Sequence, residues 1–559
     1  MNRMAVSKSV EELASTRSAQ GKVPRFRWTQ AVSICALVLT IAGTAAIRVR
    51  LLSMPLERDE GEFALAGQLI RQGHPPYDRL YNMKWPGTYY GYALIESVFG
   101  ETIKGIRLGI LCLNAVSIVL VYLIGRRLLD AYAATAAALV YAMLSISPGM
   151  LGVAGHATHF VVAAALAAIL SLQQAFSKRR LSLFLLAGFF AGLAPVMKQP
   201  GIVFTAFVAT YWLFLEVRAG ESRRVVIRHG IALLMGIGLA IGLMLVSVVA
   251  TRTFRTFWLW TISYARQYGP RFTASQAVQQ FFLGLSLSVG SGLLFWVLAG
   301  AGACLLPMHP RTRARAPFLL GFLVFSFLAV CPSLIFRTQY FLMMLPAVGL
   351  LCGAAVFVVR RRMWTESPRA AFLWVCGLIL VPLSVDLLFN SPTYFRESPD
   401  EVCRAMYGLD CPFVESAEVA DYLRQHTDPK DTIAVLGSEP QIYFYARRPP
   451  ATGHIYTYAM MEDQPYAHEF QEQMIREIEA ARPRYVVLVK MKMSWLETPK
   501  SDPTLMQWFE RYQANNLKLV GIVERDRPRH SRFRWNETEL RESKNARPVI
   551  IVYKRIAPS

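Results

Sequence analysis

The sequence predicts a polytopic α-helical membrane protein followed by a small α/β domain. Hydrophobic residues make up 54% of the 559 residues and charged residues only 18%, whereas about a quarter of the residues in a soluble domain are charged. Long apolar runs recur up to residue 390, and the sequence after that point is of mixed composition. These observations exclude a string of soluble domains.

The apolar runs fit about eleven membrane-spanning helices, because a bilayer core of about 30 Å requires about 20 helical residues. The expected spans are residues 30–52, 104–126, 131–148, 156–176, 181–197, 200–217, 229–251, 281–305, 317–336, 339–358 and 371–389.

The distribution of Lys and Arg predicts the orientation of these spans. Residues 1–29 form a basic tail that we expect to be disordered and cytoplasmic, and the span behind it is too long for a cleavable signal. Counting spans from this tail places all later basic clusters on the cytoplasmic side. These clusters are Arg126-Arg127, Lys178 to Arg180, Arg218 with Arg223, Arg224 and Arg228, Arg311 with Arg313 and Arg315, and Arg360 to Arg362.

The same count divides the chain into a tail (1–29), a membrane domain (30–390) with outer loops 53–103 and 252–280, and an extracytoplasmic domain (391–559). The net charge of +22 is thereby explained by membrane topology, and we expect no nucleic-acid partner. We expect the aromatic loop 252–280 to be an interfacial helix, with a lid over a site as the alternative.

The C-terminal region has the pattern of a small α/β domain. Apolar alternation predicts helices at 415–425 and 466–481 and strands at 432–436, 485–489, 517–523 and 549–553. No Gly-rich phosphate loop follows a strand, so we predict no nucleotide. Cys403 and Cys411 are either bonded to each other outside the cytoplasm or free thiols.

The first outer loop carries the residues with the most evident chemistry. Asp59 and Glu60 directly follow the first span, and Lys84-Trp85-Pro86-Gly87 comes later in the same loop. A carboxylate at the membrane–water boundary can act as a general base. The alternative is a solvated acidic loop, and for Glu62 we prefer that alternative.

Four short segments together resemble the C-type glycosyltransferases of glycosyltransferase family 39, which include protein O-mannosyltransferases and lipid A aminoarabinose transferases. His74-Pro75-Pro76 also spells a motif of that family, but it follows a Gly turn, and we take Lys84 as the equivalent position. The four segments are Asp59-Glu60, Lys84 to Gly87, Lys198-Gln199-Pro200-Gly201, and Phe336-Arg337-Thr338-Gln339-Tyr340-Phe341 with Leu345-Pro346.

The resemblance implies the C-type glycosyltransferase fold and a polyprenyl-phosphate sugar as the donor, used at the outer face of a bacterial inner membrane. The acceptor would be an envelope protein, lipid A or another glycan. Lys84, Arg337 and Lys198 would stabilise the leaving phosphate without a metal or other cofactor. Their alternative role is to reach lipid headgroups from helix ends.

Further site candidates follow from the same comparison of residues. Asp59 would take the proton of the acceptor in an inverting displacement, and Glu60 would orient Asp59 or the acceptor. Tyr340 belongs to the late motif. His156 shares a helix face with His159 and would bind sugar, although two His are too few to indicate a metal and could simply pack.

Two other classes of function remain open at this point. A transporter or flippase usually has inverted repeats and ionisable residues near the middle of its spans. Here the acidic residues lie at one boundary instead. A non-catalytic scaffold whose outer domain binds a partner is the third class.

Overall fold

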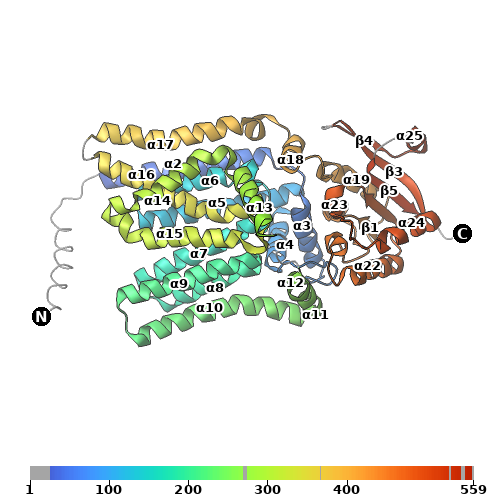
Figure 1. Ribbon diagram of the computed structural model, residues 1–559, viewed down its shortest axis with the longest axis horizontal. Helices are drawn as coiled ribbons and strands as arrows, with labels where there is room; N and C mark the ends of the chain where they lie inside the picture. The colour runs from blue at the N-terminus through green and yellow to red at the C-terminus, as the bar shows by residue number, and fades with distance from the viewer. Residues whose placement is uncertain (1–24, 268–272, 365–366, 528–529, 543–547, 557–559) are drawn as a thin grey trace.

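The chain forms an elongated bundle of long helices joined at one end to an α/β domain, as Figure 1 shows. The computed structural model describes residues 25–267, 273–364, 367–527, 530–542 and 548–556. The expected disordered tail is residues 1–29. Residues 1–24 lie outside the described residues, and residues 25–29 are instead helical, as the start of the first spanning helix. The predicted fold class, helical membrane bundle plus small C-terminal sheet domain, is confirmed.

Nine helical segments among the described residues are long and apolar enough to cross a membrane. Two shorter apolar helices, α6 (Ala131–Leu144) and α8 (Leu181–Met197), occupy the other two expected spans. Ten helices make up the nine segments, because α13 and α14 belong to one segment, Ala274–Met308. They are α2 (Arg25–Arg50), α5 (Ile103–Leu128), α7 (Ala157–Lys178), α9 (Ile202–Ala219), α10 (Arg223–Ala250), α13 (Ala274–Val289), α14 (Leu293–Leu305), α15 (Pro310–Val330), α16 (Leu345–Trp364) and α17 (Pro368–Phe389).

Small residues allow the membrane helices to approach closely, as expected where lipid provides no hydrophobic driving force for helix association. At Gly188, a Cβ atom would lie 2.0 Å from the carbonyl oxygen of Leu233, so only glycine lets α8 pack against α10. The span containing α16 is almost entirely buried and forms the centre of the bundle, whereas α17 lies at its periphery.

The first outer loop folds into two helices, α3 (Arg58–Arg71) and α4 (Gly87–Phe99), between the bundle and the C-terminal domain (Figure 1). The second outer loop contains α11 (Phe254–Trp258), a π-helix (Leu259–Tyr264) and α12 (Ala265–Gln267). Trp260 stacks on Phe470 of the C-terminal domain with ring centroids 4.5 Å apart. This part of the loop therefore packs against the C-terminal domain; residues 268–272 lie outside the described residues.

The C-terminal domain is built on a five-stranded sheet in the order β1-β2-β5-β3-β4. β1 and β2 are parallel, and the other neighbouring pairs are antiparallel. The strands are β1 (Ile433–Leu436), β2 (Tyr485–Val489), β3 (Leu517–Arg527), β4 (His530–Arg534) and β5 (Pro548–Arg555).

The helices of this domain include both predicted ones and several that the apolar pattern did not predict. They are α18 (Pro399–Tyr407), α19 (Phe413–Gln425), α20 (Gln441–Ala446), α21 (Tyr458–Met461), α22 (Ala467–Ala481), α23 (Lys492–Trp495), α24 (Thr504–Asn516) and α25 (Glu537–Glu542). Cys403 is buried, Cys411 is half-buried, and both are free thiols.

Candidate active site

The first turn of α3 places acidic side chains where the bundle meets the C-terminal domain. Glu57 caps the helix: its Oε1 accepts a hydrogen bond from the Glu60 backbone N–H at 3.0 Å, and Glu60 Oε2 accepts one from the Glu57 N–H at 3.2 Å. This reciprocal capping box fixes the start of the helix. Asp59 therefore lies in the first turn, where the helix dipole favours a negative charge.

Glu60 lies inside the protein rather than on the surface of the site. Its side chain is fully buried and forms a two-pronged ion pair with Arg107 of α5, with Oε2 2.9 Å from Arg107 Nη2. The Gly155 backbone N–H donates to Oε1 at 2.5 Å. Both carboxylate oxygens of Glu60 thus have hydrogen-bond partners, and they connect α3 to α5 and to the segment before α7. Its neighbour Asp59 is the acidic residue that faces the site.

The turn that carries Lys84 is held against the end of α8. A Cβ atom on Gly87 would lie 2.5 Å from the Val196 carbonyl oxygen, so this approach requires glycine. Gln199 Nε2 donates to the Met83 carbonyl at 2.6 Å, and Thr88 Oγ1 donates to the Met197 carbonyl at 2.8 Å. Two segments of the predicted motif, 84–87 and 198–201, are thereby joined.

Lys84 is the cation that pairs with Asp59. Its Nζ lies 2.8 Å from Asp59 Oδ1 and 2.5 Å from Glu62 Oε2, and Asp59 and Lys84 are both half-buried. Burial alone would lower the pKa of Lys84, but the charges of Asp59 and Glu62 outweigh burial and raise it. Burial would likewise raise the pKa of Asp59, but the Lys84 charge outweighs it and holds the pKa well below its usual range.

The expectation that Glu62 is solvated is wrong. Glu62 is fully buried, and its Oε1 accepts a hydrogen bond from the Tyr89 hydroxyl at 2.5 Å. Burial, together with the charge of Asp59, raises its pKa. The spacing of three residues between Asp59 and Glu62 was the signal in the sequence, because residues three apart share a helix face.

Lys198, Tyr340 and Arg337 complete the cationic side of the site. Lys198 Nζ lies 4.1 Å from the centre of the Tyr340 ring, a cation–π contact. Burial, together with the charges of Lys84 and Arg337, lowers the pKa of Lys198 to about 8 against the attraction of Asp59. Arg337 is exposed. His74, the lesser motif candidate, pairs instead with Asp78 at 3.0 Å.

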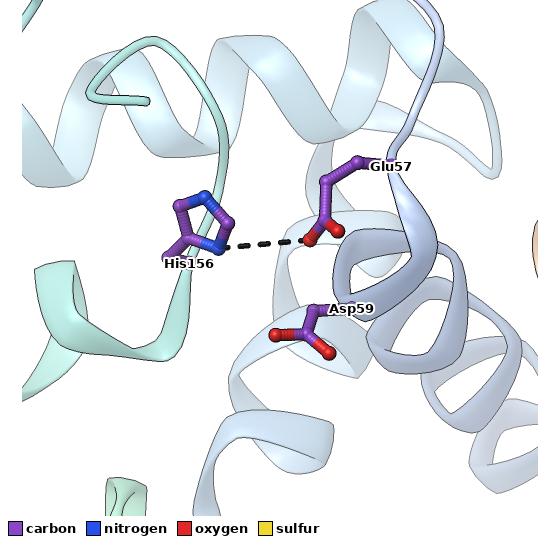
Figure 2. A group of neighbouring side chains, drawn as sticks. All are labelled: Glu57, Asp59 and His156. Carbon is purple, nitrogen blue, oxygen red and sulfur yellow. Dashed lines mark ion pairs between the residues drawn. The ribbon is translucent and has the colours of Figure 1, made fainter. Parts of the chain in front are cut away.

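His156 lies beside the acidic turn, as Figure 2 shows. It precedes α7, is almost completely buried, and places Nδ1 3.6 Å from Glu57 Oε1. Burial lowers its pKa to about 3, so the ring is neutral. One ligand atom each of Glu57, Asp59 and His156 lies within 4.8 Å of the other two, so among the described residues these three could hold a divalent cation.

The charges around Glu57, Asp59 and His156 disfavour the binding of a metal cation. Burial, with the charges of Asp59 and Glu60, raises the pKa of Glu57 to about 8, so Glu57 is mostly protonated at neutral pH. A metal would have to displace that proton. The Lys84 ammonium, 2.8 Å from Asp59, already supplies a positive charge there.

The C-terminal domain contributes a residue that no feature of the sequence singled out. The Tyr456 hydroxyl donates to the Arg58 carbonyl oxygen at 2.9 Å and lies 3.4 Å from Asp59 Oδ1. The Lys84 ammonium lies 5.4 Å from the centre of the same ring. Tyr456 is about 400 residues from Asp59 in the chain, and no local pattern could connect them.

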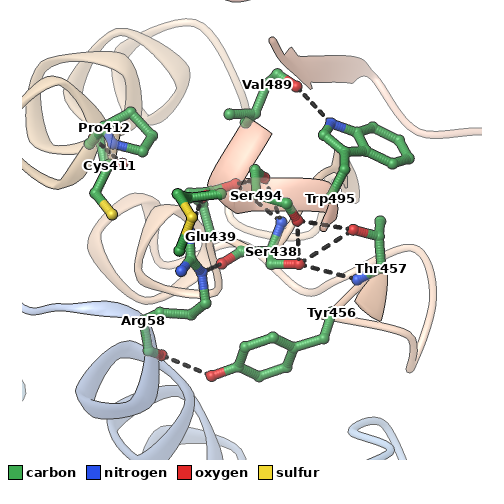
Figure 3. Close-up of polar contacts among 12 residues, drawn as sticks. Arg58, Cys411, Pro412, Ser438, Glu439, Tyr456, Thr457, Val489, Ser494 and Trp495 are labelled. Atoms are coloured by element: carbon green, nitrogen blue, oxygen red, sulfur yellow. Dashed lines mark hydrogen bonds and ion pairs between the residues drawn. The ribbon is translucent and has the colours of Figure 1, made fainter. Parts of the chain in front are cut away.

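A buried ion pair anchors this contact, as Figure 3 shows. Arg58 Nη2 lies 2.8 Å from Glu439 Oε1, and Arg58 Nε donates to the Ser438 carbonyl oxygen at 2.6 Å. Ser494 Oγ donates to Glu439 Oε2 at 2.5 Å. Ser438, Glu439 and Ser494 follow the carboxyl ends of the parallel strands β1 and β2. The residues at these strand ends therefore hold Arg58, the neighbour of Asp59 in the chain, in place.

We expect that replacing Glu439 with Gln lowers the free energy of unfolding by about 3–5 kcal/mol, because it leaves the buried Arg58 charge unpaired. The thermal unfolding of the full chain in detergent measures this change. Replacing Glu472 with Gln is the control, since its pair with Arg476 is exposed. An equal shift of the unfolding temperature in the two variants would contradict a stabilising role of the buried Arg58–Glu439 pair. Adding Arg58→Met to the Glu439 variant should lower the free energy of unfolding only a little further.

One family model matches part of the chain. Residues 83–251 match the family model described as dolichyl-phosphate-mannose-protein mannosyltransferase, a segment that includes Lys84, His156 and Lys198 but begins after Asp59. No curated protein matches the chain.

Solved structures share the fold over nearly the whole chain. The structure of ArnT from Cupriavidus metallidurans bound to undecaprenyl phosphate is 14% identical and has a TM-score of 0.60, covering 92% of this chain and 97% of that one. The Archaeoglobus fulgidus oligosaccharyltransferase tethered with an acceptor peptide is 13% identical, with a TM-score of 0.50 and coverage of 94% and 76%.

The fold and the matched segment define the class: the chain is a multi-pass membrane protein of the C-type glycosyltransferase fold. Within that class, residues 83–251 match the family model of dolichyl-phosphate-mannose-protein mannosyltransferases. The family resemblance seen in the sequence is therefore confirmed.

Proposed function

We propose that the protein transfers a sugar from a polyprenyl-phosphate carrier to an envelope acceptor at the outer face of a bacterial inner membrane. The acceptor is a protein, lipid A or another glycan. The N-terminus is cytoplasmic and the C-terminal domain is extracytoplasmic in this proposal. The observation that carries it is the single cluster of Asp59, Lys84, Lys198 and Arg337 where the bundle meets the C-terminal domain.

The cations of this cluster suit a phosphate leaving group. A polyprenyl-phosphate sugar keeps its tail in the lipid and presents its phosphate at the headgroup level. When the bond from the anomeric carbon to the phosphate oxygen breaks, negative charge develops on that oxygen. Fixed cations such as Lys198 and Arg337 stabilise this charge without rearrangement. The similar ArnT structure has undecaprenyl phosphate bound, which supports this choice of carrier.

Asp59 is the residue that we assign as proton acceptor. The acceptor oxygen or nitrogen attacks the anomeric carbon, its proton passes to Asp59, and polyprenyl phosphate leaves. One direct displacement inverts the anomeric centre. Because Lys84 holds the pKa of Asp59 low, Asp59 becomes a better base when Lys84 turns toward the donor phosphate. Glu60 positions α3, and Tyr340 and His156 border the donor.

We expect transfer to proceed without a divalent cation, because Lys84 supplies the positive charge beside Asp59. The measurement uses purified protein, lipid-linked sugars as donors, and envelopes of a strain that lacks the protein as acceptors, with and without EDTA. Activity that EDTA abolishes and a divalent cation restores would contradict this prediction and indicate a metal at Glu57, Asp59 and His156.

We expect kcat/KM to fall as the pH rises through about 8, because Lys198 loses the charge that binds phosphate. The pKa of Lys198 is lowered to about 8, so its charged form prevails below that pH and its neutral form above it. Lys198→Arg should move this alkaline limb upward by more than one pH unit, since arginine remains protonated. Lys104→Arg is the control and should leave the limb in place. A limb that stays at pH 8 in Lys198→Arg would refute this role.

Mass spectrometry of envelope glycans tests the function itself. A strain that lacks the protein should lose one glycan modification, and the intact gene should restore it. An unchanged set of glycans would count against transfer. A lost glycan that an Asp59→Asn variant restores as well as the intact gene does would favour a transporter or a scaffold.

A further inference from the structure

A pocket lined by arginine lies at the end of the bundle that faces away from the C-terminal domain. α9 begins next to Lys198 and carries Arg218 in its last turn. α15 ends shortly before Arg337 and carries Arg311 in its first turn. At 1.5 Å per residue, these helices place both arginines about 30 Å from the candidate active site, so this pocket is separate from that site.

The pocket combines an aromatic lining with positive charge. It has a volume of about 380 Å³, within the range of about 300–1,000 Å³ that ligand sites occupy. Tyr211, Phe214 and Phe318 line it. Arg218 and Arg315 contribute its charge together with Arg311, and no acidic side chain is among its lining residues.

None of these three arginines forms an ion pair with a carboxylate within the described part of the chain, although the charge of Asp130 acts on Arg311. Arg218 Nη1 donates to the Ala314 carbonyl oxygen at 3.4 Å, and Arg311 Nε donates to the Leu128 carbonyl oxygen at 3.2 Å. Acidic residues at this end are already paired with other cations: Asp130 with Arg360, Glu221 with Arg179, and Glu216 with His229.

The three exposed guanidinium groups give this pocket a concentrated positive charge that favours the binding of an anion. Arginine forms planar, two-pronged hydrogen bonds to phosphate oxygens. The ends of spanning helices lie at the headgroup level of a bilayer, where lipid phosphates are the abundant anions, and basic pockets between helices there bind anionic headgroups.

We propose that this pocket binds the headgroup of an anionic phospholipid in the leaflet opposite the active site. The phosphate lies among Arg218, Arg311 and Arg315, and the glycerol and upper acyl chains contact the aromatic lining. The lipid thereby joins α9 to α15, two helices whose other ends border the active site.

Native mass spectrometry of the full chain in neutral detergent tests the proposal. The probes are phosphatidylglycerol and phosphatidylcholine with identical acyl chains, and glycerol 3-phosphate as a headgroup without chains. We expect phosphatidylglycerol to bind at least tenfold more tightly than phosphatidylcholine. The triple variant Arg218→Gln, Arg311→Gln, Arg315→Gln should lose this preference, since each basic residue near an anionic headgroup contributes about a fivefold change in affinity.

The control removes the same number of charges elsewhere at the same end, by Arg126→Gln, Arg127→Gln and Arg180→Gln, and should keep the preference. Equal losses in the two triple variants would overturn the proposal, as would a native protein without preference. If glycerol 3-phosphate binds as tightly as phosphatidylglycerol, the ligand of the pocket is a soluble phosphate and not a lipid, which overturns the proposal. If the triple variant does not fold, Arg315→Gln alone, at an exposed residue, should weaken phosphatidylglycerol binding about fivefold.

Discussion

Replacing Asp59 with Asn is expected to lower kcat by about 10²–10⁴-fold, the contribution of a general base. The amide keeps the shape of the carboxylate but cannot accept the proton of the attacking group. Folding should be preserved, because Asp59 is half-buried and the capping box of α3 is formed by Glu57 and Glu60. Binding of polyprenyl phosphate should be unchanged or tighter, because a negative charge is removed from the site.

This variant separates the three classes of function that the sequence leaves open. An enzyme loses turnover and still binds the carrier lipid, and a scaffold is unaffected. A transporter would still move its substrate across vesicles. Asp78→Asn is the matched control, because Asp78 is a more exposed residue of the same loop that pairs with His74. Equal transfer activity in Asp59→Asn and Asp78→Asn would refute the assignment of the base.

Replacing Lys84 with Met is expected to lower transfer by at least about 10²–10³-fold, the usual cost of removing one group that stabilises charge in the transition state. The substitution also leaves Asp59 and the buried Glu62 without their shared cation, since Lys84 Nζ lies 2.8 Å from one and 2.5 Å from the other. We therefore expect a loss of stability as well, of a few kcal/mol.

Two further variants distinguish loss of charge stabilisation from loss of structure. Lys84→Met combined with Glu62→Gln should recover stability, because the buried charge is removed, but should remain inactive. Lys84→Arg should retain part of the activity, because it retains the charge. Lys104→Met, at an exposed lysine of the same outer rim, should behave like the native protein. An active double variant would show that Lys84 serves only the fold.

The membrane class, the order of the spans and several site residues could be predicted from the sequence, because these depend on local patterns. A span is an uninterrupted apolar run, and α7 and α10 lie where such runs predicted them. The two short helices α6 and α8 were also visible as apolar runs. Asp59 stood out because acidic residues directly follow the first span, and Lys84 because it precedes a Trp-Pro-Gly turn in the same outer loop.

The partners of these residues could not be predicted, because each contact joins segments far apart in the chain. Glu60 is adjacent to Asp59 in sequence, yet the tertiary structure buries it against Arg107. Glu62 is buried by Tyr89 and Lys84 although its surrounding sequence is that of a solvated loop. The apolar pattern also did not predict α24, whose helical residues are mostly polar.

The sequence by itself determined that this is a multi-pass membrane protein with its acidic and basic motif residues on one rim, since hydropathy and charge placement are local properties. Only the tertiary structure decided which of those charges meet. It pairs Lys84 with Asp59 and Glu62, and it brings Tyr456 and Glu439 from the C-terminal domain to the start of α3. The reason is that a buried charge must find a partner, and packing, not chain order, determines which one is within reach.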